Sequence, residues 1–95
     1  MAAYVIGEIE VTDPVAYEEY RKQVPAVIAK HGGKYLVRGG AVEPLEGGWT
    51  PKRLVVLEFP SLEKAQAWYR SSDYAPLIPI RQAASRAKLA IVVGV

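Results

Sequence analysis

Three charged residues lie in strand segments that are otherwise apolar, and they are the first candidates for chemistry. Glu8, Arg38 and Glu58 would share one face of a sheet if each strand alternates regularly. The planar fork of an arginine between two carboxylates suits the binding of a small carboxylate or an enolate. A carboxyl group taken out of water holds its proton more tightly, so Glu58 is also a candidate proton shuttle. The pattern indicates a small-anion site.

Arg38 and Glu58 also have a purely structural interpretation. Opposite charges on neighbouring strands form ion pairs, and such pairs are common in sheets and at protein interfaces. The two residues would then join two protomers without binding a ligand. A connected, partly polar cavity around both residues favours the ligand site, and a cavity filled by side chains favours the structural pair.

Tyr4, His31 and Trp49 complete the candidate site residues. Tyr4 is on the same predicted sheet face as Glu8. His31, the single histidine, follows a predicted helix and is either a general base or an ordinary surface histidine. Trp49 follows a glycine pair in a predicted loop, where it is free to touch a ligand or a partner chain. Glu58 and His31 are therefore the catalytic candidates, and the others are candidates for ligand binding.

The chain lacks the side chains that most metal and haem sites require. It has no cysteine and one histidine. A metal site would have to consist of carboxylates alone, and no suitable spacing is present. The glycine pairs at 32–33, 39–40 and 47–48 lack the lysine and the strand–loop–helix order of a phosphate-binding loop. We therefore expect no metal and no cofactor.

Composition indicates one small globular domain over residues 1–95. The 12 basic and 10 acidic residues are interspersed, which leaves a net charge of +2 and no basic stripe for nucleic acid. The N-terminus has no basic segment followed by an apolar one, as a signal peptide would. No apolar run approaches the roughly 20 residues of a membrane-spanning helix. We expect a cytoplasmic protein without nucleic-acid or membrane partners.

Hydrophobic periodicity predicts the order strand, helix, strand, strand, helix, strand. The strands fall at residues 3–11, 34–39, 53–59 and 87–93, and the helices at 15–30 and 62–71. Residues 41–45 are an expected extension of the second strand past a bulge, and a short helix is expected at 77–85 after a break at two prolines. This βαββαβ order is that of the ferredoxin-like plait, an α+β fold. Its antiparallel sheet has the strand order 4-1-3-2, with the helices on one face.

The predicted strands are apolar on both faces, which one layer of helices cannot cover. The residues expected to face the helices are Val5, Ile9, Val11, Val55, Leu57 and Phe59. Those expected on the opposite face are Tyr4, Ile6, Glu8, Leu36, Arg38, Leu54, Val56 and Glu58. An antiparallel sheet with one wet face normally alternates apolar and polar residues. A second copy of the chain is the simplest cover for the second face, so we expect a homodimer.

Several strings in the chain resemble a known family. They are YVIGEIEVTDP, GGKYLVRGG, Trp49, LVVLEFPS and AWYRSSDY, in that order. Together they resemble a family of short bacterial proteins of unknown function in the dimeric α+β-barrel superfamily. The resemblance implies a homodimer whose two sheets pack face to face around a cavity. The superfamily includes cofactor-free monooxygenases, lactone isomerases, haem-dependent chlorite-degrading enzymes and proteins without known activity, so it implies no single reaction.

Two functions remain open. The first is small-molecule binding between the two sheets, extending to a cofactor-free enzyme that acts on a small carbonyl, carboxylate or aromatic metabolite. The second is a non-catalytic binding or structural dimer whose charged strand residues form interface ion pairs. RNA binding, which uses the same topology, is excluded because it stacks bases on aromatic residues of the central strands. The predicted central strand at 53–59 offers leucine, valine and glutamate on that face.

Overall fold

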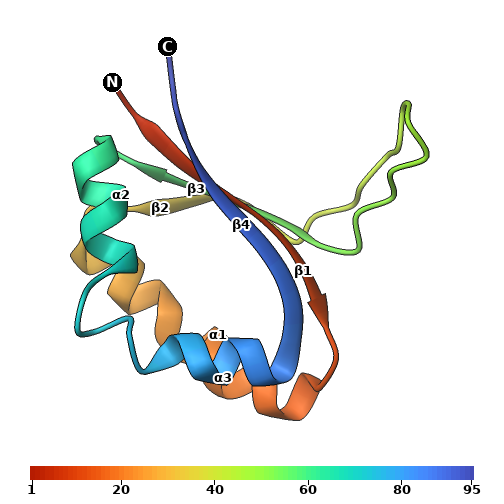
Figure 1. The fold of residues 1–95 in the computed structure, drawn as a ribbon, viewed down its shortest axis with the longest axis horizontal. Coiled ribbons are helices and arrows are strands. Elements are labelled where there is room, and N and C mark those ends of the chain that lie inside the picture. The colour runs from red at the N-terminus through yellow and green to blue at the C-terminus, as the bar shows by residue number, and fades with distance from the viewer.

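The fold is a four-stranded antiparallel sheet with three helices on one of its faces, as seen in a computed structural model that describes residues 1–95 (Figure 1). The elements are β1 (Ala3–Val11), α1 (Pro14–Lys30), β2 (Lys34–Arg38), β3 (Leu54–Phe59), α2 (Leu62–Tyr69), α3 (Leu77–Ala84) and β4 (Ser85–Val93). The spatial order β2-β3-β1-β4 is the predicted order 4-1-3-2 read from the other edge. The ferredoxin-like α+β fold expected from the sequence is confirmed.

Short polar side chains begin the first two helices where the sequence places them. The Asp13 carboxylate accepts a hydrogen bond from the Ala16 N–H at 3.1 Å. Pro14, the first residue of α1, has no backbone N–H and therefore needs no acceptor there. The Ser61 hydroxyl accepts from the Lys64 N–H at 3.2 Å and begins α2. Gly32, at a φ of +81°, ends α1 in the left-handed region that glycine adopts without strain.

The segment between β2 and β3 differs from its prediction. Residues 41–45 form no strand and belong to a loop that extends away from the body of the protein (Figure 1). The chain leaves the sheet at Gly39, which has a φ of +72° and donates the last hydrogen bond of this pairing to the Leu54 carbonyl at 2.8 Å. A left-handed residue turns the backbone out of the pleat, so pairing ends there.

The core lies between the helices and the sheet and is built on aromatic rings. Trp68 and Tyr74 have their ring centroids 4.3 Å apart, and Phe59 lies 5.5 Å from Trp68. The hydroxyl groups of Tyr20 and Tyr74 are buried and lie 2.8 Å from each other. Burial, followed by the neighbouring Tyr74, raises the pKa of Tyr20, so this hydroxyl stays protonated. The pair joins α1 to the segment between α2 and α3.

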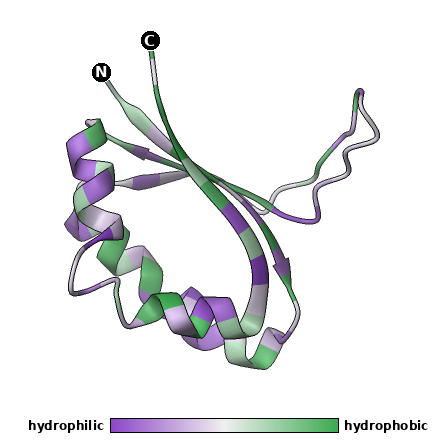
Figure 2. Cartoon of the chain, viewed as in Figure 1, coloured by the Kyte–Doolittle hydropathy of each residue, from purple (hydrophilic) through white to green (hydrophobic).

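The two faces of β1 and β3 alternate as predicted. Val5 and Leu57 are a buried register pair on the helix side. The next pair, Ile6 and Val56, lies on the opposite side, where Ile6 is 42% exposed. We call this second side the open face. Figure 2 shows apolar residues along the strands, including β4, although the helices cover the sheet from one side alone.

A β-bulge in β2 overturns the prediction for Arg38. Tyr35 pairs with Leu57 and Val37 pairs with Val56, so Leu36 is an extra residue in the strand. The extra residue reverses the alternation, and Arg38 then pairs with Val55 on the helix side of the sheet. The expectation that Arg38 shares the open face with Glu58 is therefore wrong.

The Tyr20–Tyr74 pair gives a test of the core. Tyr20→Phe leaves the Tyr74 hydroxyl buried without its partner, so we expect a loss of about 1–3 kcal/mol in the free energy of unfolding. The double variant Tyr20→Phe/Tyr74→Phe should lose less than the two single variants together, because no hydroxyl is then left unpaired. Urea unfolding monitored by circular dichroism measures both. Tyr69→Phe, at a position 37% exposed, is the control and should change little. Simple additivity of the two substitutions would contradict the interpretation.

Candidate functional site

Glu58 and Glu8 lie on the open face, and each has a partner within the same chain. The Glu58 carboxylate lies 3.3 Å from the Lys34 ammonium group. The Glu8 carboxylate accepts a hydrogen bond from the Trp49 indole N–H at 3.1 Å. Tyr4 pairs in register with Glu58, so it belongs to the same face. The structure therefore has Tyr4, Glu8 and Glu58 on one face, as alternation predicts, and the loop residue Trp49 joins them there through Glu8.

Trp49 forms one side of a groove on this open face. The groove has a volume of about 330 Å³, and Ile6, Leu54 and Ala90 give it an apolar floor. Glu8 and Lys88, which are paired in register on β1 and β4, line its polar side. A second sheet packed on the open face would enclose this groove, which is where the sequence-based hypothesis located the ligand.

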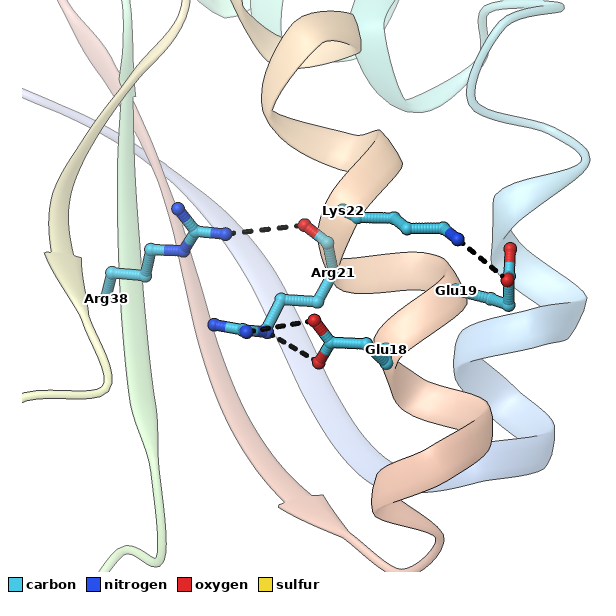
Figure 3. Close-up of polar contacts among 5 residues, drawn as sticks. All are labelled: Glu18, Glu19, Arg21, Lys22 and Arg38. Atoms are coloured by element: carbon cyan, nitrogen blue, oxygen red, sulfur yellow. Dashed lines mark hydrogen bonds and ion pairs between the residues drawn. The ribbon is translucent and has the colours of Figure 1, made fainter.

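Arg38 lies on the other side of the sheet and points toward α1 (Figure 3). Its guanidinium carbon is 4.5 Å from the centroid of the Tyr35 ring, within the range of a cation–π contact. One guanidinium nitrogen donates to the backbone carbonyl of Arg21 at 3.4 Å, longer than a typical N–H···O bond. No carboxylate contacts Arg38, because Glu18 is bound by Arg21 at 3.0 Å and Glu19 by Lys22 at 2.9 Å.

The helix-side residues enclose a small cavity between α1 and the sheet. Its volume is about 30 Å³, enough for about one water molecule. Most of the wall is apolar, with Ile28 and Leu57 among its residues. Arg21, Arg38 and Arg53 also line it, and no acidic residue does. The Nε atom of Arg53 is buried and has no hydrogen-bond acceptor. Positive charge therefore gathers at a cavity that contains no negative side chain.

Two tyrosines add hydrogen-bond donors to this cavity. Burial raises the pKa of Tyr17 and of Tyr35, although Arg38 and Arg53 act in the opposite direction on both. Both hydroxyls are therefore neutral at physiological pH and available to donate. Guanidinium and phenol groups together suit a carboxylate or an enolate, because hydrogen bonds to a charged acceptor are the strong ones. We call Tyr17, Tyr35, Arg38 and Arg53 the arginine–tyrosine cluster.

His31 stands apart from both the groove and the cavity. It follows the last residue of α1, and its Nε2 atom is 3.8 Å from the Asp73 carboxylate. Lys30 donates to the same carboxylate at 2.7 Å, and this hydrogen bond lowers the pKa of Asp73. His31 and Glu58 are not brought together. No group of three or more histidine, cysteine or acidic side chains is placed to hold a metal ion.

Sequence reasoning missed most of the arginine–tyrosine cluster. Tyr17 follows the helical period and is typical of a core residue, and Arg53 is the first residue of the predicted strand at 53–59, where nothing marks it as a ligand-binding residue. Arg38 was identified as a ligand-binding candidate but assigned to the wrong face. The one available signal is that basic and phenolic side chains recur on neighbouring elements. Tyr17 is on α1, Tyr35 and Arg38 are on β2, and Arg53 directly precedes β3.

The sheet with helices on one face places the protein in the ferredoxin-like α+β class, and solved structures share this architecture. A protein of unknown function from Rhodopseudomonas palustris matches with a TM-score of 0.79 at 20% identity, over 99% of this chain and 82% of that chain. SnoaB, a cofactor-independent oxygenase from Streptomyces nogalater, matches with a TM-score of 0.67 at 11% identity, over 99% of this chain and 93% of its own. A dimeric ferredoxin-like protein of unknown function from Jannaschia matches with a TM-score of 0.66 at 10% identity, over 99% and 100%.

Within this class, the chain belongs to the family described as a domain of unknown function, DUF1330, whose model matches residues 2–95. The family predicted from the sequence is confirmed. A search of curated proteins finds no match. None of the helices combines the length and the apolar character needed to cross a membrane.

The ion pair between Lys30 and Asp73, beside His31, predicts that the stability of the fold depends on pH. Asp73 has a lowered pKa in the folded chain, so its contribution to stability is present above about pH 4, the ordinary value for an unfolded aspartate. That contribution is lost as the pH falls through the lower folded value. Asp73→Asn should therefore be less stable than the unchanged chain at pH 7, and the difference should shrink on acidification. Thermal unfolding between pH 7 and 3 measures this, with Glu46→Gln as the control. A difference independent of pH would contradict it.

Proposed function

We propose that this protein is a homodimer that binds a small anionic molecule at the arginine–tyrosine cluster. The observation that carries the proposal is the uncompensated positive charge there: Arg53, whose Nε atom is buried, and Arg38, which is exposed, line an apolar cavity and have no carboxylate partner. Leaving the partly desolvated guanidinium of Arg53 without a counter-charge is costly. An anionic ligand would offset that cost.

The shape of the cavity indicates the kind of ligand. A carboxylate or enolate would lie against the guanidinium groups of Arg38 and Arg53, and a flat apolar or aromatic body would extend toward Leu57 and Ile28. The closed cavity is too small for such a molecule, so α1 and β2 must separate for entry. The polar contact across this opening is the 3.4 Å hydrogen bond from Arg38 to the Arg21 carbonyl, and so long a bond opens at little cost.

The same arrangement supports an extension to cofactor-free catalysis on a small carbonyl, carboxylate or aromatic metabolite. Neutral phenols and guanidinium groups stabilise negative charge that develops on a carbonyl oxygen. One protein of the same fold, SnoaB, is described as a cofactor-independent oxygenase. That likeness supports the extension at the level of the fold, and the ligand itself must come from experiment.

The open face supports the homodimer. It carries exposed apolar side chains on three of the four strands, among them Ile6 of β1, Val37 of β2 and Val92 of β4, at 42%, 40% and 47% exposure. A second copy with the same face is the natural cover, and one protein of this fold is described as dimeric. The pairing of Glu58 with Lys34 at 3.3 Å favours a structural role for that carboxylate, so a non-catalytic binding dimer is the second candidate function.

The dimer has a direct test. Ile6→Lys places a charge at the centre of the open face and should convert the dimer to monomer, because an apolar interface of about 2,000 Å² does not tolerate a buried unpaired charge. Light scattering after size-exclusion chromatography measures the mass. Val15→Lys is the control, since Val15 is 85% exposed on α1. A folded monomer for the unchanged chain at micromolar concentration would sink the homodimer.

Ligand binding is tested with benzoate as the probe and benzamide as its neutral counterpart. Benzoate should raise the thermal midpoint of the protein, and benzamide should not. Arg38→Gln and Arg53→Gln should each weaken benzoate binding by about tenfold or more, the usual cost of losing a hydrogen bond to a charged group. Arg86→Gln removes an exposed charge from β4 and is the control. Equal binding of benzoate to both cluster variants and the unchanged chain would refute the site.

A further inference from the structure

Arg81 on α3 is the most deeply buried charge in the protein. It is 3% exposed, and its side chain forms no hydrogen bond and no ion pair. The backbone beside it is fixed, because the Ser85 hydroxyl donates to the Arg81 carbonyl at 2.6 Å. A guanidinium group remains charged even when it is buried. The fold therefore holds a permanent positive charge whose Nε atom is shielded from water and which has no negative partner.

The side chains around Arg81 do not neutralise it. Burial raises the pKa of Tyr17 and of Tyr20 on α1 by more than the charge of Arg81 lowers it. Neither phenol therefore becomes an anion at physiological pH. Gln82 is the next residue on α3, and it is neutral. A buried guanidinium is stabilised by a hydrogen-bonded counter-charge, and no acidic side chain pairs with Arg81. A bound anion would supply that counter-charge.

A groove of about 390 Å³ leads to Arg81 between α2, α3 and β4. Gln82 and Ser85 make its head polar, and Tyr69 and Leu89 line its other end. The same two residues, Tyr69 and Leu89, also line a second groove of about 260 Å³. The second groove is lined by hydrophobic residues, among them Val5, Trp68 and Ile91. The two grooves adjoin at Tyr69 and Leu89, and we call the pair, with its charged head and hydrophobic tail, the β4 groove.

We propose that the β4 groove binds an amphipathic carboxylate. The carboxylate head meets the guanidinium of Arg81 and the amide of Gln82, and the hydrocarbon tail lies along Leu89 and Ile91 toward Trp68. The tail covers apolar side chains that are otherwise exposed to solvent, such as Ile91, which is 37% exposed. Grooves of a few hundred Å³ with few polar groups and apolar walls are typical of small-molecule sites.

The β4 groove is a site beyond the arginine–tyrosine cluster. It uses Arg81 rather than Arg38 and Arg53, and the two sites share walls at Trp68 and Leu89. Its charged head lies on the helix side of the sheet beside α2 and α3, away from the open face that a second copy would cover, and its apolar part reaches Ala90, which pairs with Ile6 (Figure 1). A free small molecule is therefore the occupant that fits.

Octanoate is the probe, and octanol is its neutral counterpart. Octanoate should raise the thermal midpoint of the full chain and give a saturable heat of binding in calorimetry, while octanol should bind at least about tenfold more weakly. Trp49→Phe leaves Trp68 as the single tryptophan, and octanoate should then change its fluorescence because the tail reaches the indole ring. No saturable octanoate binding, or equal binding of octanol, would overturn the proposal.

Two variants locate the head of the ligand. Arg81→Gln should weaken octanoate binding at least about tenfold. Gln82→Glu provides a carboxylate beside Arg81 on the exposed side of α3, and it should raise the thermal midpoint while also weakening octanoate. If Arg81→Gln does not fold, Gln82→Glu alone tests where the carboxylate head binds. Arg86→Gln and Gln23→Glu carry the same charge changes elsewhere and should bind octanoate normally. Unchanged affinity in Gln82→Glu would overturn the assignment.

The test also separates this site from the proposed function. Arg38→Gln should keep octanoate binding, and Arg81→Gln, or Gln82→Glu in its place, should keep benzoate binding. Octanoate binding that is lost in Arg38→Gln and kept in Gln82→Glu would place both probes at the arginine–tyrosine cluster, which would refute the β4 groove and leave the proposed function standing.

Discussion

The structure depends on one imbalance: in a chain of 95 residues, the sheet is apolar on both faces and the helices cover one of them. The helix face closes over an aromatic core around Trp68 and Tyr74. The open face keeps exposed residues such as Ile6 and Val92, which favour water less than a matching surface. Assembly is therefore the expected completion of the core in a chain too short to enclose it.

Charge is distributed unevenly across the same sheet. Two carboxylates of the open face have partners, Glu8 in the Trp49 indole and Glu58 in Lys34. On the helix side, Arg38, Arg53 and Arg81 have no carboxylate partner at all. The helix side therefore carries an excess of fixed positive charge, which is buried at Arg81, half-buried at Arg53 and exposed at Arg38, and both proposed ligand sites follow from that excess. Neutral tyrosines beside the arginines add donors without cancelling the charge.

Much of the fold could be predicted because its determinants are local. Alternation in β1 and β3, the Asp13 and Ser61 caps and the Gly32 stop are visible in the sequence, and the structure has all of them. The site was harder to predict because it depends on strand register. The open-face positions of Tyr4, Glu8 and Glu58 follow from alternation, whereas Trp49 reaches that face from a loop. The position of Arg38 depends on a bulge that no residue type near Leu36 indicates. Arg81 lies in a segment whose prolines obscure the helical pattern.

The bulge at Leu36 has a consequence for how such proteins diverge. If every residue were kept but the bulge were lost, Leu36 would pair with Val56 and Val37 with Val55, and Arg38 would turn from the helix side to the open face. Deletion of residue 36 would instead remove the extra residue and keep Arg38 opposite Val55. Chain length in β2 can therefore change between relatives without moving Arg38, whereas loss of the bulge at constant length moves it, so the pairing of β2 indicates the side of the sheet on which Arg38 acts better than its length does.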